Sequence, residues 1–160
     1  MKTPRIELEL LKHFDFTQNL IVNNVTTTSR LVNFETDLLI LSKAGYAHGV
    51  EIKVSKSDFK NDFNKSHIKT LDMERYFKNL KFFSYAFPSK LLEFAQQNVD
   101  ERFGLYSISY HEKYDSKWYE VDVVRKPKML FNKKWSDRDR MHLAHLGCMR
   151  IFNNKIKELK

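Results

Sequence analysis

The chain has 160 residues, of which 42% are hydrophobic, and this size and composition predict a single domain over residues 1–160. Its 28 Lys and Arg residues outnumber its 20 Asp and Glu residues, and the net charge of +8 favours a polyanion such as nucleic acid as partner. With 4 Gly and 3 Pro the chain is neither disordered nor repetitive, and no apolar run approaches the roughly twenty residues that span a bilayer.

The cysteine content and the N-terminus predict the compartment. Cys148 is the single cysteine, which excludes an internal disulfide and suits a reducing cytoplasm. Met1 to Arg5 are not followed by the apolar core of a signal peptide. We therefore expect a cytoplasmic protein with no membrane partner.

A first helix is predicted over residues 6–14, where apolar residues recur at helical spacing, and a strand over residues 20–28. Two further apolar runs, residues 37–41 and 49–54, predict strands joined by a hairpin, because the short link contains Gly45 and small residues. Side chains alternate along a strand, so Glu51 and Lys53 share one face and Ile52 takes the other.

That hairpin would return Asp37 to the side of Glu51. Carboxylates and an ammonium among residues that bury lose hydration unless they are paired or bind a metal, so the pattern favours a Mg²⁺ site. The competing interpretation is a Glu-x-Lys on the wet face of an amphipathic hairpin. The same tripeptide recurs at residues 158–160, where no strand pattern or upstream Asp accompanies it, and there we interpret it as a solvated helix end.

The next helix is predicted over residues 55–63, because Ser55 and Asp58 have the spacing of a capping box. Residues 64–69 are basic and predict a mobile loop, either a phosphate clamp or a solvated loop. Further strands are predicted over residues 80–87, 103–110 and 118–124, a helix over residues 89–98 and a polar loop tip over residues 111–117.

The last helix is predicted to begin at a second capping box, Ser136 and Asp139. Its Arg and Lys side chains are interpreted as a solvated face, with a face that lies along the DNA backbone as the alternative. Its predicted apolar face comprises Met141, Leu143, Leu146, Met149, Ile151, Phe152 and Ile156. Altogether, these elements predict an α/β fold, with a central mixed β-sheet flanked by helices.

A strand with Asp37, a hairpin, a strand with Glu51-Ile52-Lys53 and a helix starting at Ser55 resemble the PD-(D/E)XK nuclease superfamily, in particular its small stand-alone phage and bacterial members. The motif resemblance covers residues 34–63, and a weaker one continues through residues 76–110. Thr36 departs from the pattern, since the family usually has Pro before the Asp. The resemblance implies a restriction-endonuclease-like core and a location in a bacterial or phage-infected cell.

By this resemblance, Asp37, Glu51 and the backbone carbonyl of Ile52 would bind Mg²⁺, for which Mn²⁺ could substitute. A water made more acidic by the metal would attack the phosphorus. Lys53 would orient that water and stabilise the developing charge, or act as a base if its pKa is lowered.

Other residues are candidates for the same site. An acidic residue of the first helix, Glu7 or Glu9, often completes it, and Glu35 is open between a metal ligand and an ion-pair partner. Ser55, Lys56, Lys65 and Lys69 are the candidate nucleic-acid-binding residues.

The sequence therefore predicts a metal-dependent DNA endonuclease, which in this superfamily commonly serves DNA repair and can act as a homodimer. Two alternatives remain open at this stage. One is a DNA-binding repair or recombination accessory with a nuclease-like fold and no cutting activity, and the other is an RNA-directed nuclease or a tRNA-handling protein.

Overall fold

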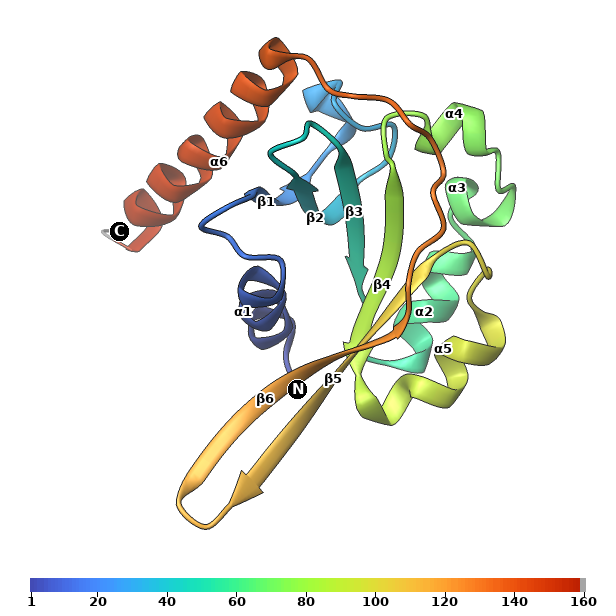
Figure 1. Ribbon diagram of the computed structural model, residues 1–160, viewed down its shortest axis with the longest axis vertical. Coiled ribbons are helices and arrows are strands. Elements are labelled where there is room, and N and C mark those ends of the chain that lie inside the picture. Colours follow the sequence, from blue (N-terminus) through green and yellow to red (C-terminus); the bar gives the residue numbers. More distant parts are fainter. Residues whose placement is uncertain (159–160) are drawn as a thin grey trace.

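The computed structural model describes residues 1–158 and contains a six-stranded mixed sheet with helices on both faces (Figure 1). The strands follow chain order across the sheet, and β3–β4 and β4–β5 are parallel pairs while the other three pairs are antiparallel. The strands are β1 (Leu20–Val25), β2 (Thr36–Leu41), β3 (Ala47–Ile52), β4 (Phe82–Pro88), β5 (Gly104–Lys113) and β6 (Ser116–Arg125). The predicted α/β class and mixed sheet are confirmed.

Helix α1 (Thr3–His13) covers one face of the sheet, where Ile6 and Leu10 are fully buried against side chains of β2 and β3. The opposite face is covered by α2 (Lys56–Phe63), α3 (Ser66–Lys69), α4 (Met73–Phe77) and α5 (Leu92–Asn98), with short 3₁₀ turns at Thr27–Ser29 and Ser89–Leu91. Phe59, Phe77 and Ala95 from these helices pack on Phe83, Tyr85 and Phe87 of β4. Two separate cores therefore hold the sheet between layers of helices.

The β2–β3 hairpin forms as the sequence predicted. Gly45 adopts a φ of +88° in the link and donates its N–H to Ser42 O at 2.9 Å, a conformation that favours glycine. Leu38 pairs with Val50 across the two strands, which places Asp37 and Glu51 at the same end of the hairpin. On the other sheet neighbour, Glu51 pairs with Tyr85 of β4.

Two predicted loops were wrong. Residues 64–69 are not a free loop: after the cap of α2 the chain turns into α3, and its Ile68 packs on the core. The predicted tip at residues 111–117 is instead part of a long β5–β6 hairpin, in which only Tyr114 and Asp115 form the turn. Polar side chains there do not end the strands, because both faces of a projecting hairpin meet solvent.

The last helix, α6 (Asp137–Glu158), lies beside β1 at the sheet edge (Figure 1). Its capping box is confirmed, since Asp139 N–H donates to Ser136 Oγ at 3.2 Å and Ser136 N–H donates to Asp139 Oδ2 at 3.1 Å. The predicted apolar face is mostly wrong: Leu143 is buried and Leu146 packs on the core, but the other members are exposed. The helix packs mainly along β1, so its side chains that point away from β1 are not covered by the described elements.

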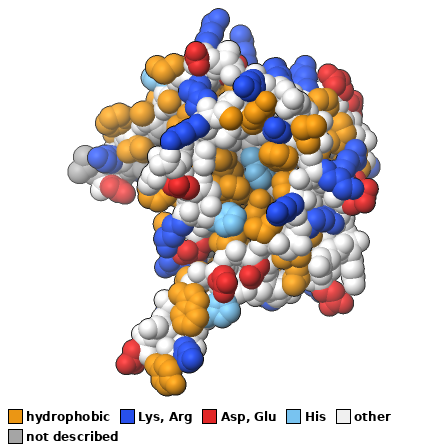
Figure 2. Space-filling view, in the orientation of Figure 1, with side chains coloured by type: hydrophobic (Ala, Val, Ile, Leu, Met, Phe, Trp, Pro, Cys, Tyr) orange, Lys and Arg blue, Asp and Glu red, His pale blue; other side chains and the backbone are white. Residues whose placement is uncertain are grey.

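Leu159 and Lys160, which complete the second Glu-x-Lys, lie outside the described residues. Among residues 1–158, no helix has the length and apolarity needed to cross a bilayer. The Lys and Arg side chains are spread over the face seen in Figure 2 and are not confined to one element.

Candidate functional site

The candidate site begins where β2 and β3 part. Asp37 is half-buried, and its Oδ2 accepts a hydrogen bond from the backbone N–H of Ile52 at 2.7 Å. The next amide, Lys53 N–H, donates to Ala86 O of β4, and the peptide between them is trans. The C=O and N–H of a trans peptide point in opposite directions. Because Lys53 N–H points toward β4, the Ile52 carbonyl points away from β4 and toward the Asp37 side.

Glu51 and Lys53 lie together under α2, as their shared strand face predicted. Their side chains are 3% and 5% exposed, and Lys53 Nζ donates to Glu51 Oε2 at 3.0 Å. Ile52 and Val54 belong to the core on the α1 face, which confirms the predicted alternation. A buried ion pair of this kind is weak evidence for stability, because desolvation offsets the attraction, and this favours a functional reason for its presence.

A residue that the sequence interpretation missed completes the arrangement. Asp62 of α2 has a fully buried side chain, and its Oδ1 lies 3.0 Å from Lys53 Nζ and 2.7 Å from Lys65 Nζ. Its Oδ2 accepts a hydrogen bond from the hydroxyl of Tyr85 at 2.7 Å. One signal was present in the sequence: Asp62 follows Phe59 by one helical turn, so it had to share the buried face of α2.

The electrostatics of the site leave Glu51 poorly compensated. Burial, reinforced by the negative charges of Asp37 and Asp62, raises the pKa of Glu51 to about 8, although Lys53 acts in the opposite direction. Near neutral pH, much of this carboxyl group is therefore protonated unless a further cation neutralises it.

Lys53 shows the opposite behaviour. Burial alone would lower the pKa of Lys53, but the carboxylates of Glu51 and Asp62 outweigh burial and raise it. Asp62 keeps its charge, because Lys53 and hydrogen bonds from Lys65 and Tyr85 lower its pKa against the effect of burial. Lys53 is accordingly an ammonium ion held between two carboxyl groups.

The structure distinguishes the two acidic residues of the first helix. Burial and the charge of Asp37 raise the pKa of Glu7, so Glu7 lies close enough to Asp37 to interact with it. Glu9 instead pairs with Arg5 at 3.3 Å and Lys12 at 3.2 Å on another side of α1. Of the two first-helix acids, Glu7 is therefore the one whose charge interacts with that of Asp37.

The remaining candidate residues differ in their exposure and in their partners. Glu35 is exposed, and its charge acts on Arg150 of α6, which favours the ion-pairing alternative. Ser55 caps α2 by accepting the N–H of Asp58 at 3.1 Å. Lys65 turns inward to Asp62, whereas Lys56 and Lys69 are exposed and available to solvent.

The residues present fit a divalent cation. The charges of four carboxyl groups interact at this end of the sheet, those of Glu7, Asp37, Glu51 and Asp62, whereas two ammonium groups, those of Lys53 and Lys65, pair with Glu51 and Asp62. Within residues 1–158, no set of three or more His, Cys, Asp or Glu side chains is arranged to hold a metal ion by itself. Mg²⁺ commonly uses one or two carboxylates and takes its other ligands from water and substrate phosphates, so Asp37, Glu51 and the Ile52 carbonyl suffice as donors.

Comparisons with known proteins give information about the fold of this chain but not about its activity. No protein-family model matches the chain, and no curated protein matches it in sequence. A solved structure, the SPO1766 protein of unknown function from Silicibacter pomeroyi, has a TM-score of 0.59 and 15% identity over 96% of this chain and 89% of that chain. At this identity the similarity shows the fold alone, and the α/β fold of this chain is shared with that protein.

Proposed function

We propose that this protein is a metal-dependent nuclease of the PD-(D/E)XK type, which hydrolyses phosphodiester bonds in DNA. The observation that carries the proposal is the meeting of Asp37, Glu51 and Lys53 where β2 and β3 part, with Asp37 bonded to Ile52 N–H at 2.7 Å and Lys53 bonded to Glu51 at 3.0 Å. A hairpin that needed only stability would gain more from apolar residues at buried positions.

The charge balance supports a role for a cation at this end of the sheet. Asp37 and Glu51 would hold Mg²⁺ or Mn²⁺ together with the Ile52 carbonyl, and Glu7 would stand behind Asp37. Bound there, the metal would supply Lewis-acid chemistry at the phosphoryl oxygens. Neutralising Glu51 would also remove the cost of keeping its carboxylate ionised in a buried position.

Lys53 would act as a cation in this site. Since Glu51 and Asp62 raise its pKa, the metal-free protein holds it as an ammonium and not as a free base. An ammonium held at the end of β3 can donate a hydrogen bond to a phosphate oxygen and stabilise the negative charge that develops there. Asp62 would hold the Lys53 ammonium in position, because the two carboxylate oxygens of Asp62 are themselves fixed by contacts with Lys53, Lys65 and Tyr85.

The test is cleavage of supercoiled, linear, branched and single-stranded DNA, and of a matched RNA, in Mg²⁺, in Mn²⁺ and in chelator. We expect cutting in either metal, none in chelator, none with Asp37→Ala, and a residual rate lowered by about a hundredfold or more with Lys53→Ala. Wild-type rates in either variant would contradict the assignment. Binding without cutting in every metal would identify a non-cleaving DNA-binding accessory, and cutting of the RNA alone would identify a ribonuclease.

A further inference from the structure

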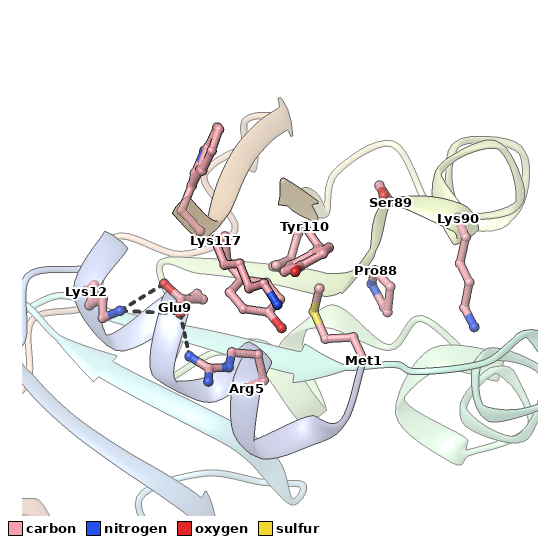
Figure 3. Close-up of a pocket in the computed structure, with 12 residues that line it drawn as sticks. Met1, Arg5, Glu9, Lys12, Pro88, Ser89, Lys90, Tyr110 and Lys117 are labelled. Carbon is pink, nitrogen blue, oxygen red and sulfur yellow. Dashed lines mark hydrogen bonds and ion pairs between the residues drawn. The ribbon is translucent and has the colours of Figure 1, made fainter. Parts of the chain in front are cut away.

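A groove of about 830 Å³ lies between α1 and the projecting β5–β6 hairpin, apart from the carboxylates of the candidate site. Figure 3 shows Arg5 and Met1 from the helix side and Tyr110 and Lys117 from the hairpin facing a common space, with Pro88 and Ser89 at its far end. This volume is within the range of roughly 300–1,000 Å³ that ligand sites occupy.

The groove is basic, and its charges are accessible. Arg5, Lys12 and Lys117 line it with side chains that are 44%, 56% and 64% exposed, and Lys90 adds a fourth cation. Its one acid is Glu9, which is 8% exposed and already paired with Arg5 and Lys12. Just outside the lining, Glu112 lies 3.5 Å from Lys117 Nζ, but both side chains are more than half exposed, so this ion pair is weak in water. The groove therefore keeps an excess of positive charge, which suits the phosphates of a nucleic acid.

Aromatic rings lie among these cations. Tyr110 is 45% exposed, and its ring centroid is 5.1 Å from that of Tyr119, the ring on which Arg5 rests at 4.7 Å. The Tyr110 hydroxyl donates a hydrogen bond to Glu112 Oε2 at 2.8 Å, which fixes the orientation of this half-exposed ring. Basic grooves with accessible aromatic rings bind unpaired strands, whose bases can stack on the rings, whereas the bases of a duplex already stack on one another.

The groove and the candidate site lie at the same end of the sheet. Pro88 closely follows Ala86, whose carbonyl accepts the Lys53 N–H at 2.9 Å. Arg5 and Glu7 lie on different sides of α1, since they are two residues apart on a helix, so α1 separates the groove from the carboxylates. Lys53 lies on the α2 face and the groove on the α1 face, so a strand leaving the neighbourhood of Lys53 would reach the groove by passing around the end of the sheet near Pro88.

We propose that this groove binds an unpaired nucleic-acid strand, with Lys117 and Arg5 on its phosphates and Tyr110 stacked on a base. Given the proposed nuclease function, the substrate class would be DNA that carries a single-stranded tail beside the cutting position, such as a fork or flap. The binding of the strand itself does not depend on cleavage.

The test measures binding of a fluorescent oligothymidylate of roughly fifteen nucleotides, and of a duplex of equal length, by anisotropy in chelator. The groove variants are Tyr110→Leu and Lys117→Ala. Tyr114→Leu and Lys113→Ala are matched controls, because both residues are exposed on the same hairpin and outside the groove lining. An oligouridylate in a parallel series distinguishes RNA from DNA as the source of the strand.

We expect each groove variant to bind the single strand roughly fivefold or more weakly, and Lys117→Ala also to lower the salt dependence of binding. Duplex binding should change less than twofold, and the control variants should match the wild type. Normal binding by the groove variants, an equal loss in the controls, or no binding of the single strand by the wild type would overturn the proposal.

Cleavage separates this inference from the proposed function. In Mg²⁺, the groove variants should cut a plain duplex at the wild-type rate and a tailed duplex more slowly at low substrate concentration. If the wild type binds the single strand through the groove but cuts nothing in any metal, the proposed nuclease function is wrong and strand binding by the groove is supported. If the wild type cuts DNA while the groove variants bind the single strand normally, strand binding by the groove is wrong and the nuclease function is supported.

Discussion

Lys53 Nζ of the β3 end lies 3.0 Å from Asp62 Oδ1 of α2, so a side chain of the second helix positions the lysine of the candidate site. We expect Asp62→Asn to lower the single-turnover cleavage rate by about tenfold or more, because Lys53 keeps only Glu51 as partner. The rate should change little in a Lys53→Ala background, since Asp62 acts through that lysine.

Stability controls for that variant are available in the same network. Breaking a buried ion pair costs about 3–5 kcal/mol, so urea unfolding must show that Asp62→Asn remains folded at the assay temperature. Tyr85→Phe removes only the 2.7 Å hydrogen bond to Asp62 and should give a milder loss of rate. Additive losses of rate in the Lys53→Ala, Asp62→Asn double variant would contradict the positioning role.

Glu51 is expected to reduce stability while supporting activity. Its folded-state pKa of about 8 lies above its ordinary value of 4.5, so the fold disfavours the ionised form, and stability from this group falls as pH rises through that window. In chelator at pH 9, Glu51→Gln should therefore be about 1–3 kcal/mol more stable than the wild type, and the difference should shrink at pH 5. Urea unfolding at both pH values measures the difference.

The same variant provides the functional half of this prediction. Glu51→Gln should lose metal-dependent cutting, because the amide is a poorer ligand for Mg²⁺ than a carboxylate. It should also lose most of the rise in melting temperature that Mg²⁺ gives the wild type. A variant that is no more stable at high pH, or that cuts normally, would show that Glu51 is an ordinary structural ion pair.

Glu7 and Glu9 form a matched pair of acidic residues on one helix. Glu7→Gln should weaken Mg²⁺ binding by about tenfold, because Glu7 interacts with Asp37, and second-layer carboxylates affect metal affinity on this scale. Glu9→Gln should leave Mg²⁺ binding unchanged, because Glu9 pairs with Arg5 and Lys12. Isothermal titration with Mg²⁺ compares the two, and equal effects would remove Glu7 from the site.

A buried histidine predicts sensitivity to acid. Burial, with a smaller effect of His13, lowers the pKa of His48 to about 3, and His48 Nε2 lies 2.8 Å from Ser84 Oγ. Because the folded pKa lies below the ordinary value of 6.5, the stability from this group is present above 6.5 and is lost as pH falls toward 3.

His48→Gln removes that titration. Between pH 6.5 and pH 4, the wild type should lose about 2–3 kcal/mol more stability than the variant, as measured by urea unfolding. His67 provides a second acid-sensitive group, since burial lowers its pKa to about 4, so the variant should still lose some stability in acid. Parallel stability curves for the wild type and the variant would refute the assignment to His48.

Local patterns in the sequence predicted the parts of the site that depend on one or two strands. The alternation of Glu51 and Lys53 with Ile52 placed two charges on one face, and Gly45 in a short link predicted the return of Asp37 to Glu51. These relationships are set by the period of a strand and by turn geometry, which act over a few residues.

Other features depend on how whole helices and strands pack against one another. The β5–β6 hairpin is long and extends past the rest of the sheet, and most apolar side chains in the second half of α6 are exposed because they point away from β1. The spacing of apolar residues in the sequence does not reveal how far an element extends beyond its neighbours or which of its side chains they cover. The apolar residues of α6 have helical spacing, but apart from Leu143 and Leu146 no described layer covers them.

The sequence by itself determined the α/β class, the strands of the site and the pairing of Asp37 with the Glu51 strand, because each follows from short-range spacing. Only the tertiary structure decided that Asp62 holds Lys53, that Lys65 pairs with Asp62, and that Glu7 rather than Glu9 interacts with Asp37. Those outcomes depend on how α1 and α2 dock on opposite faces of the sheet, and docking is decided by long-range packing of the two cores.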